Sequence, residues 1–215
     1  MNDQTDFSSL IRITSMDALK AATEARSKSD AASYRMAVRQ IFAGAEGILW
    51  YAKCMARAAA KMQPETYSAL EIAALNDETY AVAENGTVRT KPNFIPMVHS
   101  MKLVADLMSR KQVSNADFTF DQKMLATIKQ AVAVRNRLTH PKSGNDLLVT
   151  EEEFNVVVAS WGLMLAFTLN TALEADKRLG TGIFPVVKTT KVSLLDALVG
   201  ATQHDIDAGD TPPDT

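Results

Sequence analysis

The feature that most constrains the fold is a stretch over residues 30–62 that contains no proline and stops just before Pro64. Asp30 is a good N-cap residue, and the apolar positions that follow recur at helical spacing: Met36, Val38, Ile41, Phe42, Ile48, Leu49, Met55 and Ala59. This pattern predicts one long helix. In a chain of 215 residues, 9 glycines and 7 prolines are few, which argues against a turn-rich sandwich or barrel. The predicted fold class is therefore all-α.

Four more helices are predicted downstream from capping residues, prolines and apolar spacing. They cover about residues 64–76, 98–108, 121–140 and 150–178. The third of these ends at His140, because Pro141 pushes the preceding residue out of the helical region. The last begins with a capping box that starts at Thr150, and Gly180 follows it as a C′ residue.

Between the helices expected at 64–76 and 98–108, the sequence changes to a period of two residues. Asn85-Gly86 lies between short alternating runs, which is the signal for a β-hairpin with a two-residue turn. A hairpin of this size is marginally stable alone, so we expect it to lie against the helices.

The chain is expected to form one core domain with an addition at each end. The core is a helical bundle of about five main helices over residues 30–180, with the hairpin as an insertion. Residues 1–29 are expected to form an extension with a short helix. Residues 181–215 are expected to form an extension with a short helix and a flexible acidic tail.

Cysteine usage and apolar runs bear on the cellular compartment. Cys54 is the single cysteine, so an intrachain disulfide and a cysteine-based zinc site are excluded. The first residues carry no basic flank and no apolar run. The longest apolar stretch, residues 156–167, is shorter than the roughly 20 residues that span a bilayer and is better explained as a core helix. We expect a cytoplasmic protein with no membrane partner.

A local strip of positive charge lies in a chain whose net charge is −2. Residues 122–145 hold five basic side chains and no acidic one. On a helical wheel, Asn136 and His140 share one edge of the apolar face and Arg137 points away from it. Arg135 falls in the middle of that face, where an unpaired charge would be costly. The face is made of Met124, Leu125, Ile128, Ala131, Val132 and Leu138.

A purely structural explanation is open for each of these residues. A basic side chain in a last helical turn is favoured by the helix dipole, and an arginine on an apolar face can form a core ion pair. Glu46 interrupts the apolar face of the long helix and can pair with Arg135, either as a structural ion pair or as part of a functional site. Trp50, Tyr51 and Trp161 stand among aliphatic residues and are predicted to be core.

The segment Arg135-Asn136-Arg137-Leu138-Thr139-His140, followed by Pro141, resembles the RNxxxH motif of the HEPN superfamily. Members of this superfamily are compact helical bundles, and many are metal-independent RNases. The resemblance extends over residues 33–178. The chain is similar in its long first helix with Phe-Ala-Gly-Ala-Glu-Gly at 42–47, its hairpin, its motif helix and its capped final helix.

The resemblance implies a homodimer in which two motif helices meet and form one composite site that cleaves RNA. His140 would be the general acid and base, since an imidazole exchanges protons near neutral pH. Arg135 would bind the scissile phosphate with its planar, permanently charged fork. Asn136 would orient the imidazole or the phosphate. The resemblance implies no metal and no other cofactor.

Other residues would support this chemistry. The basic side chains of Lys129, Arg137 and Lys142 would guide the RNA backbone. Glu46 and Thr139 would lie behind the catalytic residues. A nuclease of this kind is expected to act as a toxin or in phage defence, with a cognate antitoxin as a partner.

Two other functions stay open on the sequence. One is a catalytically silent HEPN-like helical dimer that binds a nucleotide or a protein through the same cleft. The other is a scaffold in which Arg135 makes a structural ion pair.

Overall fold

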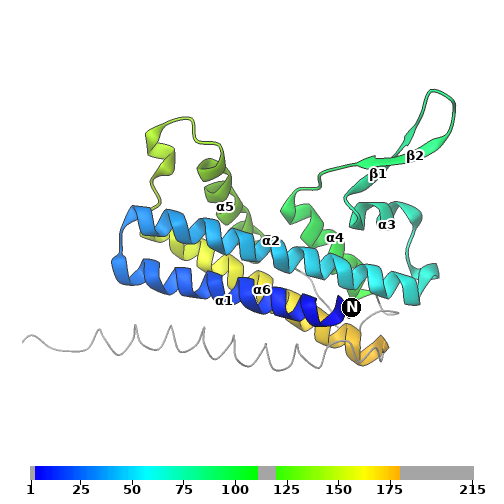
Figure 1. Cartoon of the computed structure of the whole chain (residues 1–215), viewed down its shortest axis with the longest axis horizontal. Coiled ribbons are helices and arrows are strands. Elements are labelled where there is room, and N and C mark those ends of the chain that lie inside the picture. The colour runs from blue at the N-terminus through cyan, green and yellow to red at the C-terminus, as the bar shows by residue number, and fades with distance from the viewer. Residues whose placement is uncertain (1–2, 111–119, 180–215) are drawn as a thin grey trace, which may run out of the picture.

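The computed structural model of the protein describes residues 3–110 and 120–179, and these residues confirm the all-α prediction. They form six α-helices and one antiparallel hairpin of two strands (Figure 1). Short 3₁₀ turns precede α3 and α6, at Pro64–Thr66 and Gly144–Leu147. The helices are α1 (Asp3–Lys28), α2 (Ala31–Met62), α3 (Ala69–Leu75), α4 (Met97–Ser109), α5 (Gln122–Thr139) and α6 (Glu151–Leu179). The predictions for residues 180–215 lie outside the described residues.

The predicted helix starts at Asp30 and Thr150 are confirmed, and each carries a local cap. The Asp30 carboxylate accepts hydrogen bonds from the backbone N–H groups of Ala32 and Ser33 at the start of α2. At the start of α6, the N–H of Glu153 donates to Thr150 Oγ1, and the Glu153 carboxylate accepts from the N–H of Thr150. Such caps satisfy N–H groups that have no partner within the helix, so they fix a boundary locally.

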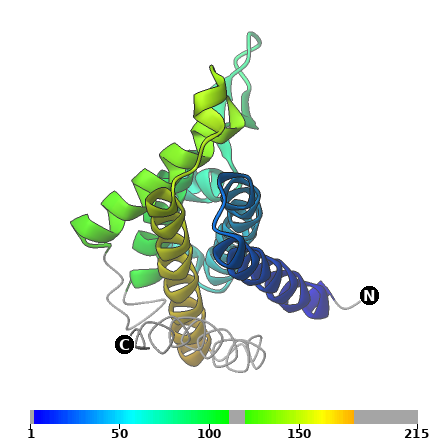
Figure 2. The ribbon, with the colours of Figure 1, turned by 90° about the vertical axis from the view of Figure 1, so that its left-hand side faces the viewer.

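The hydrophobic core lies around α2, which contacts α1, α4, α5 and α6 (Figures 1 and 2). Phe154 of α6 stacks on Tyr34 of α2 with ring centroids 4.7 Å apart. The stretch Glu151–Thr171 is long and apolar enough to cross a membrane by length and composition, and 56 % of its most apolar part is buried inside this fold. The buried part includes Phe154 and Trp161, as in the core helix that the sequence predicts.

The N-terminal segment is not the short helix that was expected. α1 has 26 residues and packs along α2 (Figure 1). Over residues 12–28, its fully buried positions are small residues at helical spacing, which offer no strong apolar signal but allow two helix backbones to approach closely. These are Ser15, Ala18, Ala22 and Ala25.

α1 and α2 approach closely at Gly44, and we predict that a large side chain there separates the two helices. A Cβ atom at Gly44 would lie 3.2 Å from the carbonyl oxygen of Thr14 and 3.4 Å from Ala18 Cβ. Gly44→Leu should therefore lower the free energy of unfolding by about 1–3 kcal/mol through overpacking. Thermal and urea unfolding would measure the change.

Gly47 is the matched control for this substitution. A Cβ atom there would meet Thr14 Oγ1 at 3.7 Å, which is ordinary van der Waals contact. Gly47→Ala should leave stability unchanged or raise it by up to about 1 kcal/mol, because alanine is the better helix former. Equal losses in the two variants would contradict the close packing at Gly44.

The hairpin is confirmed, but its turn and its packing differ from the prediction. Strands β1 (Glu78–Val82) and β2 (Val88–Pro92) pair, and the N–H of Ala83 donates to the carbonyl of Thr87. Three residues therefore form the loop, with Gly86 alone in the left-handed region at φ +77°. A two-residue type I′ turn would need positive φ at Asn85 as well, which costs more than the single glycine does.

The hairpin contacts α3 through β1 and otherwise projects away from the helices (Figure 1). Every residue of β2 is exposed. The expectation that the hairpin lies against the helices is therefore wrong for most of its length. Its position is fixed at its base, where the N–H of Asn93 donates to the carbonyl of Asp77 at 2.6 Å.

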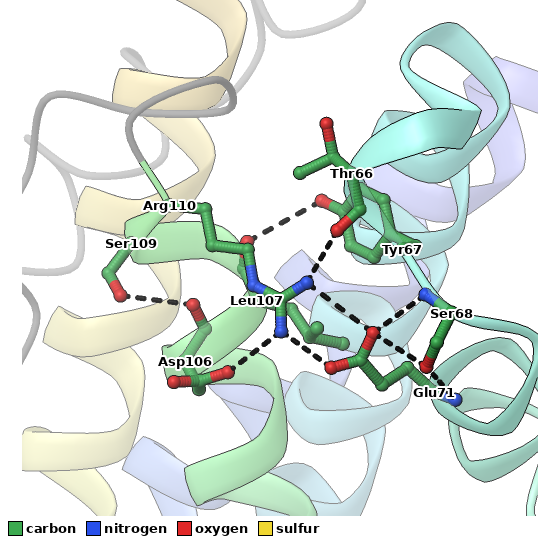
Figure 3. A network of polar contacts seen from close by, with 8 residues as sticks. All are labelled: Thr66, Tyr67, Ser68, Glu71, Asp106, Leu107, Ser109 and Arg110. Carbon is green, nitrogen blue, oxygen red and sulfur yellow. Dashed lines mark hydrogen bonds and ion pairs between the residues drawn. The ribbon is translucent and has the colours of Figure 1, made fainter.

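A charged clamp at Arg110 joins the end of α4 to the start of α3 (Figure 3). Its guanidinium donates to the Glu71 carboxylate at 2.5 Å, to Asp106 at 3.1 Å and to the carbonyl of Thr66. It also lies over the Tyr67 ring, 5.6 Å from the centroid. The hydrogen bond from Arg110 and one from the Ser68 N–H lower the pKa of Glu71 from 4.5 to about 2. Burial raises the pKa of Tyr67 to about 12.

We predict that this clamp makes stability fall in acid. The pKa of Glu71 is lower in the folded chain, so its contribution is complete above pH 4.5 and is lost as the pH falls toward 2. Glu71→Gln keeps the capping box with Ser68 but loses the charge. It should cost about 1–2 kcal/mol at pH 7, and the difference from wild type should shrink as the pH falls through about 2 and vanish below it. Urea unfolding across this pH range would measure it.

Asp106→Asn is the control for the clamp. The Asp106 side chain is 70 % exposed, so its ion pair with Arg110 should contribute little. A loss at Glu71→Gln that is independent of pH would contradict the role given to the Glu71 charge.

Candidate functional site

The motif lies at the C-terminal end of α5, where this helix extends beyond the long helices (Figure 2). Arg135 Nη2 donates to Glu46 Oε1 of α2 at 2.6 Å, and Arg135 Nη1 donates to Asn136 Oδ1 at 3.3 Å. The Arg135 side chain keeps 35 % of its surface exposed. The pairing of Arg135 with Glu46 that the sequence allowed is therefore present, at the surface rather than in the core.

His140 ends the motif helix, as predicted. Its backbone N–H donates to the carbonyl of Asn136 at 3.0 Å, and its φ of −128° and ψ of 60° leave the helical region. The residue is exposed, and no hydrogen bond or ion pair to its imidazole occurs among the described residues. Thr139 Oγ1 donates to the carbonyl of Arg135 at 2.9 Å, so it supports the helix backbone of the motif.

The Arg137 side chain is engaged in contacts within the chain and does not face solvent freely. Its Nη2 donates to Glu153 Oε2 at 2.7 Å and to the carbonyl of Leu148 at 3.0 Å, while its buried Nε has no partner. The wheel placed Arg137 opposite the apolar face, but α6 packs on that side of α5 and also buries Val134. The geometry therefore assigns Arg137 to holding α6 and the preceding loop against the motif helix.

The two lysines expected to guide RNA are both exposed. Lys129 lies on α5, and Lys142 follows Pro141. The backbone N–H groups of Lys142 and Ser143 donate to the Asp146 carboxylate and lower its pKa. This turn fixes the backbone at Lys142 and leaves its side chain in solvent.

Two hollows meet at the Arg135–Glu46 pair, because both of these residues line both hollows. The smaller hollow, of about 200 Å³, lies between α2 and α5 and includes Arg39, Phe42 and Thr139. The larger one, of about 300 Å³, is lined from α2, α4, α5, the turn after α3 and the segment before α4. We call the larger one the aromatic hollow, because it is lined by Trp50 and Phe94 together with Lys53, Asp77 and Ser100.

The prediction that Trp50 belongs to the core is wrong, since 43 % of this residue is exposed. Tyr51 and Trp161 are buried, as predicted. The spacing of the polar residues around Trp50 in the sequence indicates its exposure. Trp50 is four residues after Glu46 and three before Lys53, and Arg39 is seven residues before Glu46, so these four residues share one face of α2. That face borders both hollows.

A second ion pair stands in the wall of the aromatic hollow. The Lys53 side chain is 7 % exposed and donates from Nζ to Asp77 Oδ1 at 2.5 Å. Asp77 adopts a positive φ of 55° in the turn between α3 and β1, a conformation that an L-residue seldom takes outside such turns. The turn holds its carboxylate at Lys53, and burial makes that pairing necessary for the lysine.

Comparisons of the chain with protein-family models, with curated proteins and with solved structures find no match. Within residues 3–110 and 120–179, no three His, Cys, Asp or Glu side chains are grouped as ligands for a metal ion. The chemistry available at the site is that of an exposed imidazole, a half-exposed guanidinium, an amide and two ion pairs beside exposed aromatic rings.

Proposed function

We propose that the protein is a metal-independent endoribonuclease of the HEPN type that acts as a homodimer. The observation that carries this proposal is the arrangement at one end of α5. Arg135 opens onto two hollows, and His140 stands exposed at the C-cap one turn further along. A second copy placed against this end would bring a second Arg135 and His140 to the same RNA strand.

In the proposed reaction, the imidazole of one His140 takes the proton from a ribose 2′-hydroxyl. The 2′-oxygen then attacks the adjacent phosphorus, and the bond from phosphorus to the 5′-oxygen breaks. The second His140 donates a proton to that leaving oxygen, so the products carry a 2′,3′-cyclic phosphate and a 5′-hydroxyl. Arg135 stabilises the charge on the non-bridging phosphate oxygens.

The ion pair with Glu46 defines how Arg135 would work. A guanidinium has five N–H donors, and Glu46 and Asn136 each accept one of them. The carboxylate thus holds the guanidinium at the edge of the hollows while other donors stay available to a phosphate. A surface pair of this kind contributes at most about 1 kcal/mol, so a phosphate can displace it.

The test is cleavage of single-stranded or loop RNA by the purified protein in EDTA, with analysis of the ends produced. We expect 2′,3′-cyclic phosphate ends and a dimer by sedimentation at micromolar concentration. No cleavage over a broad substrate panel would overturn the nuclease, and a monomer would overturn the composite site. We further propose that such a nuclease serves as a toxin or in phage defence, where a cognate antitoxin would restrain it.

A catalytically silent binding module is the second candidate, and one observation favours it. The charge of Arg135 is neutralised by Glu46 at 2.6 Å, and His140 lines neither of the two hollows. In this case the dimer would bind nucleotide or protein through the same cleft without cleaving RNA. RNA binding without cleavage, unchanged by His140→Ala, would favour this candidate.

A further inference from the structure

We propose that the aromatic hollow is a nucleobase site, in which a base of the RNA strand stacks on Trp50 and Phe94 next to the phosphate held by Arg135. This inference rests on the proposed function for the identity of the strand. It adds a binding site beside the motif, on residues that the motif does not include.

The first argument is the exposure of two aromatic side chains around one hollow. Trp50 is 43 % exposed and Phe94 is 88 % exposed, and both line the aromatic hollow. Large apolar side chains normally lose such exposure on folding, so two of them at one site indicate a binding surface. Every base presents an aromatic face, and stacking on protein rings is a general way to bind single strands.

The second argument is the polar wall behind the rings. Lys53, 7 % exposed at its side chain, and Ser100, 1 % exposed, both line the hollow. Asp77 Oδ1 is the one acceptor for Lys53 Nζ among the described residues, although an ammonium carries three donors. The wall can therefore donate to a base carbonyl and accept from a base amino group. The Lys53–Asp77 pair cancels in charge, so this part of the hollow suits a neutral base better than a phosphate.

The third argument is that the segment carrying Phe94 is held at both sides. The N–H of Asn93 donates to the carbonyl of Asp77, and Ser100 Oγ donates to the carbonyl of Ile95 at 3.4 Å. The Phe94 backbone is thus fixed against the same Asp77 that pairs with Lys53. A backbone held in place before binding loses less conformational entropy when a base stacks on the Phe94 ring.

The position of Arg135 beside the rings favours a base that belongs to a nucleic acid strand. Arg135 lines the aromatic hollow, so a phosphate at its guanidinium places a neighbouring base at the rings. A nucleobase on the RNA strand therefore fits the hollow better than an uncharged aromatic ligand, which would leave the guanidinium unused. Base and phosphate together would fix the strand with respect to His140.

The test measures binding of single-stranded hexaadenylate RNA to a His140→Ala variant of the full chain, which removes cleavage from the measurement. The chain has two tryptophans, and Trp161 is 1 % exposed, so quenching of tryptophan fluorescence reports on Trp50. We expect quenching by the RNA. Trp50→Ala and Phe94→Ala should each weaken binding about 5- to 150-fold, the range for loss of one stacked base.

Matched variants keep the result interpretable. Trp50→Phe should retain most of the affinity but lose the quenching, which separates stacking from a folding defect. Tyr80→Ala, at an exposed aromatic residue on the hairpin outside the hollow, should bind like its parent. A hexamer with abasic sugars should bind equally weakly to the parent and to Trp50→Ala.

The measurements distinguish failure of the base site from failure of the proposed nuclease. Equal affinity of the parent, Trp50→Ala and Phe94→Ala, or no binding of the hexamer by the parent, would overturn the base site. If the wild type cleaves RNA with the same KM as Trp50→Ala, the nuclease stands and the base site fails. If the wild type does not cleave but binding depends on the base and on Trp50, the base site stands and the nuclease fails.

Discussion

Replacing His140 with alanine is expected to lower the rate of RNA cleavage by about 10²- to 10⁴-fold, the range that positioned proton transfer supplies. The loss should appear in kcat, because His140 lines neither hollow and contributes little to holding the strand. The fold should be unaffected, since the imidazole is exposed and its backbone alone caps α5. Single-turnover cleavage in EDTA would measure the effect.

The matched control is His99→Ala. His99 is also exposed on a helix, α4, and belongs to neither hollow. Its replacement should leave the rate within about twofold of wild type. A similar loss at His99 and His140 would indicate a general effect of removing a histidine, and full activity of His140→Ala would refute its role as acid and base.

The composite site also predicts how dimers of one wild-type and one His140→Ala copy behave. If each dimer uses one His140 as base and the other as acid, a mixed dimer with one altered copy lacks one of the two groups at its composite site. Mixing wild type with a fivefold excess of His140→Ala should then suppress cleavage beyond simple dilution. Activity in proportion to the wild-type copies alone would show that one chain is sufficient.

The features predicted correctly from the sequence are those that local chemistry fixes. Asp30, Thr150 and the Pro141 that follows His140 place helix ends to within a residue, because caps and proline act on the backbone nearby. Gly86 marks the hairpin turn for the same reason, although the loop has three residues. Such features need no knowledge of what packs against them.

The features that were missed depend on tertiary neighbours. Arg137 points away from the apolar face of α5, yet α6 covers it, because a helix between two others has two buried sides. Trp50 is apolar and lies on a core helix, yet no helix covers its side of α2 fully. A helical wheel shows which residues share a face, but the packing of the other helices decides whether that face is buried. The sequence therefore predicts the motif at the candidate site but does not predict the aromatic hollow.

The half-buried position of Arg137 makes it unsuitable as a control for the effect of positive charge on RNA binding. Arg137→Ala would remove the ion pair with Glu153 and leave the loop before α6 without its anchor. A loss of activity there would not report on RNA binding. Lys123, exposed in the first turn of α5 and outside both hollows, is the better control for general positive charge.

Replacing Arg135 with lysine is expected to lower kcat for RNA cleavage by about 10²- to 10³-fold, the cost of losing one preorganised donor to a developing negative charge. Lysine keeps the charge and can still pair with Glu46, so the fold and much of the RNA affinity should remain. It loses the planar fork that contacts two phosphate oxygens at once. Cleavage kinetics with a measured KM would separate the two effects.

Glu46→Gln tests the role of Arg135 by changing its ion-pair partner. Glutamine keeps an acceptor for Arg135 Nη2 but removes the negative charge beside the proposed phosphate, so KM should fall while kcat stays within a few-fold of wild type. If Glu46→Gln abolishes cleavage while its melting temperature is unchanged, the carboxylate positions Arg135, and the ion pair is part of the active state rather than one that the phosphate displaces.

Lys123→Ala is the control for Arg135→Lys, and it should raise KM slightly, and only at low salt. If Arg135→Lys and Lys123→Ala lose activity equally, the strip of basic residues acts as a charged surface and not as a catalytic site.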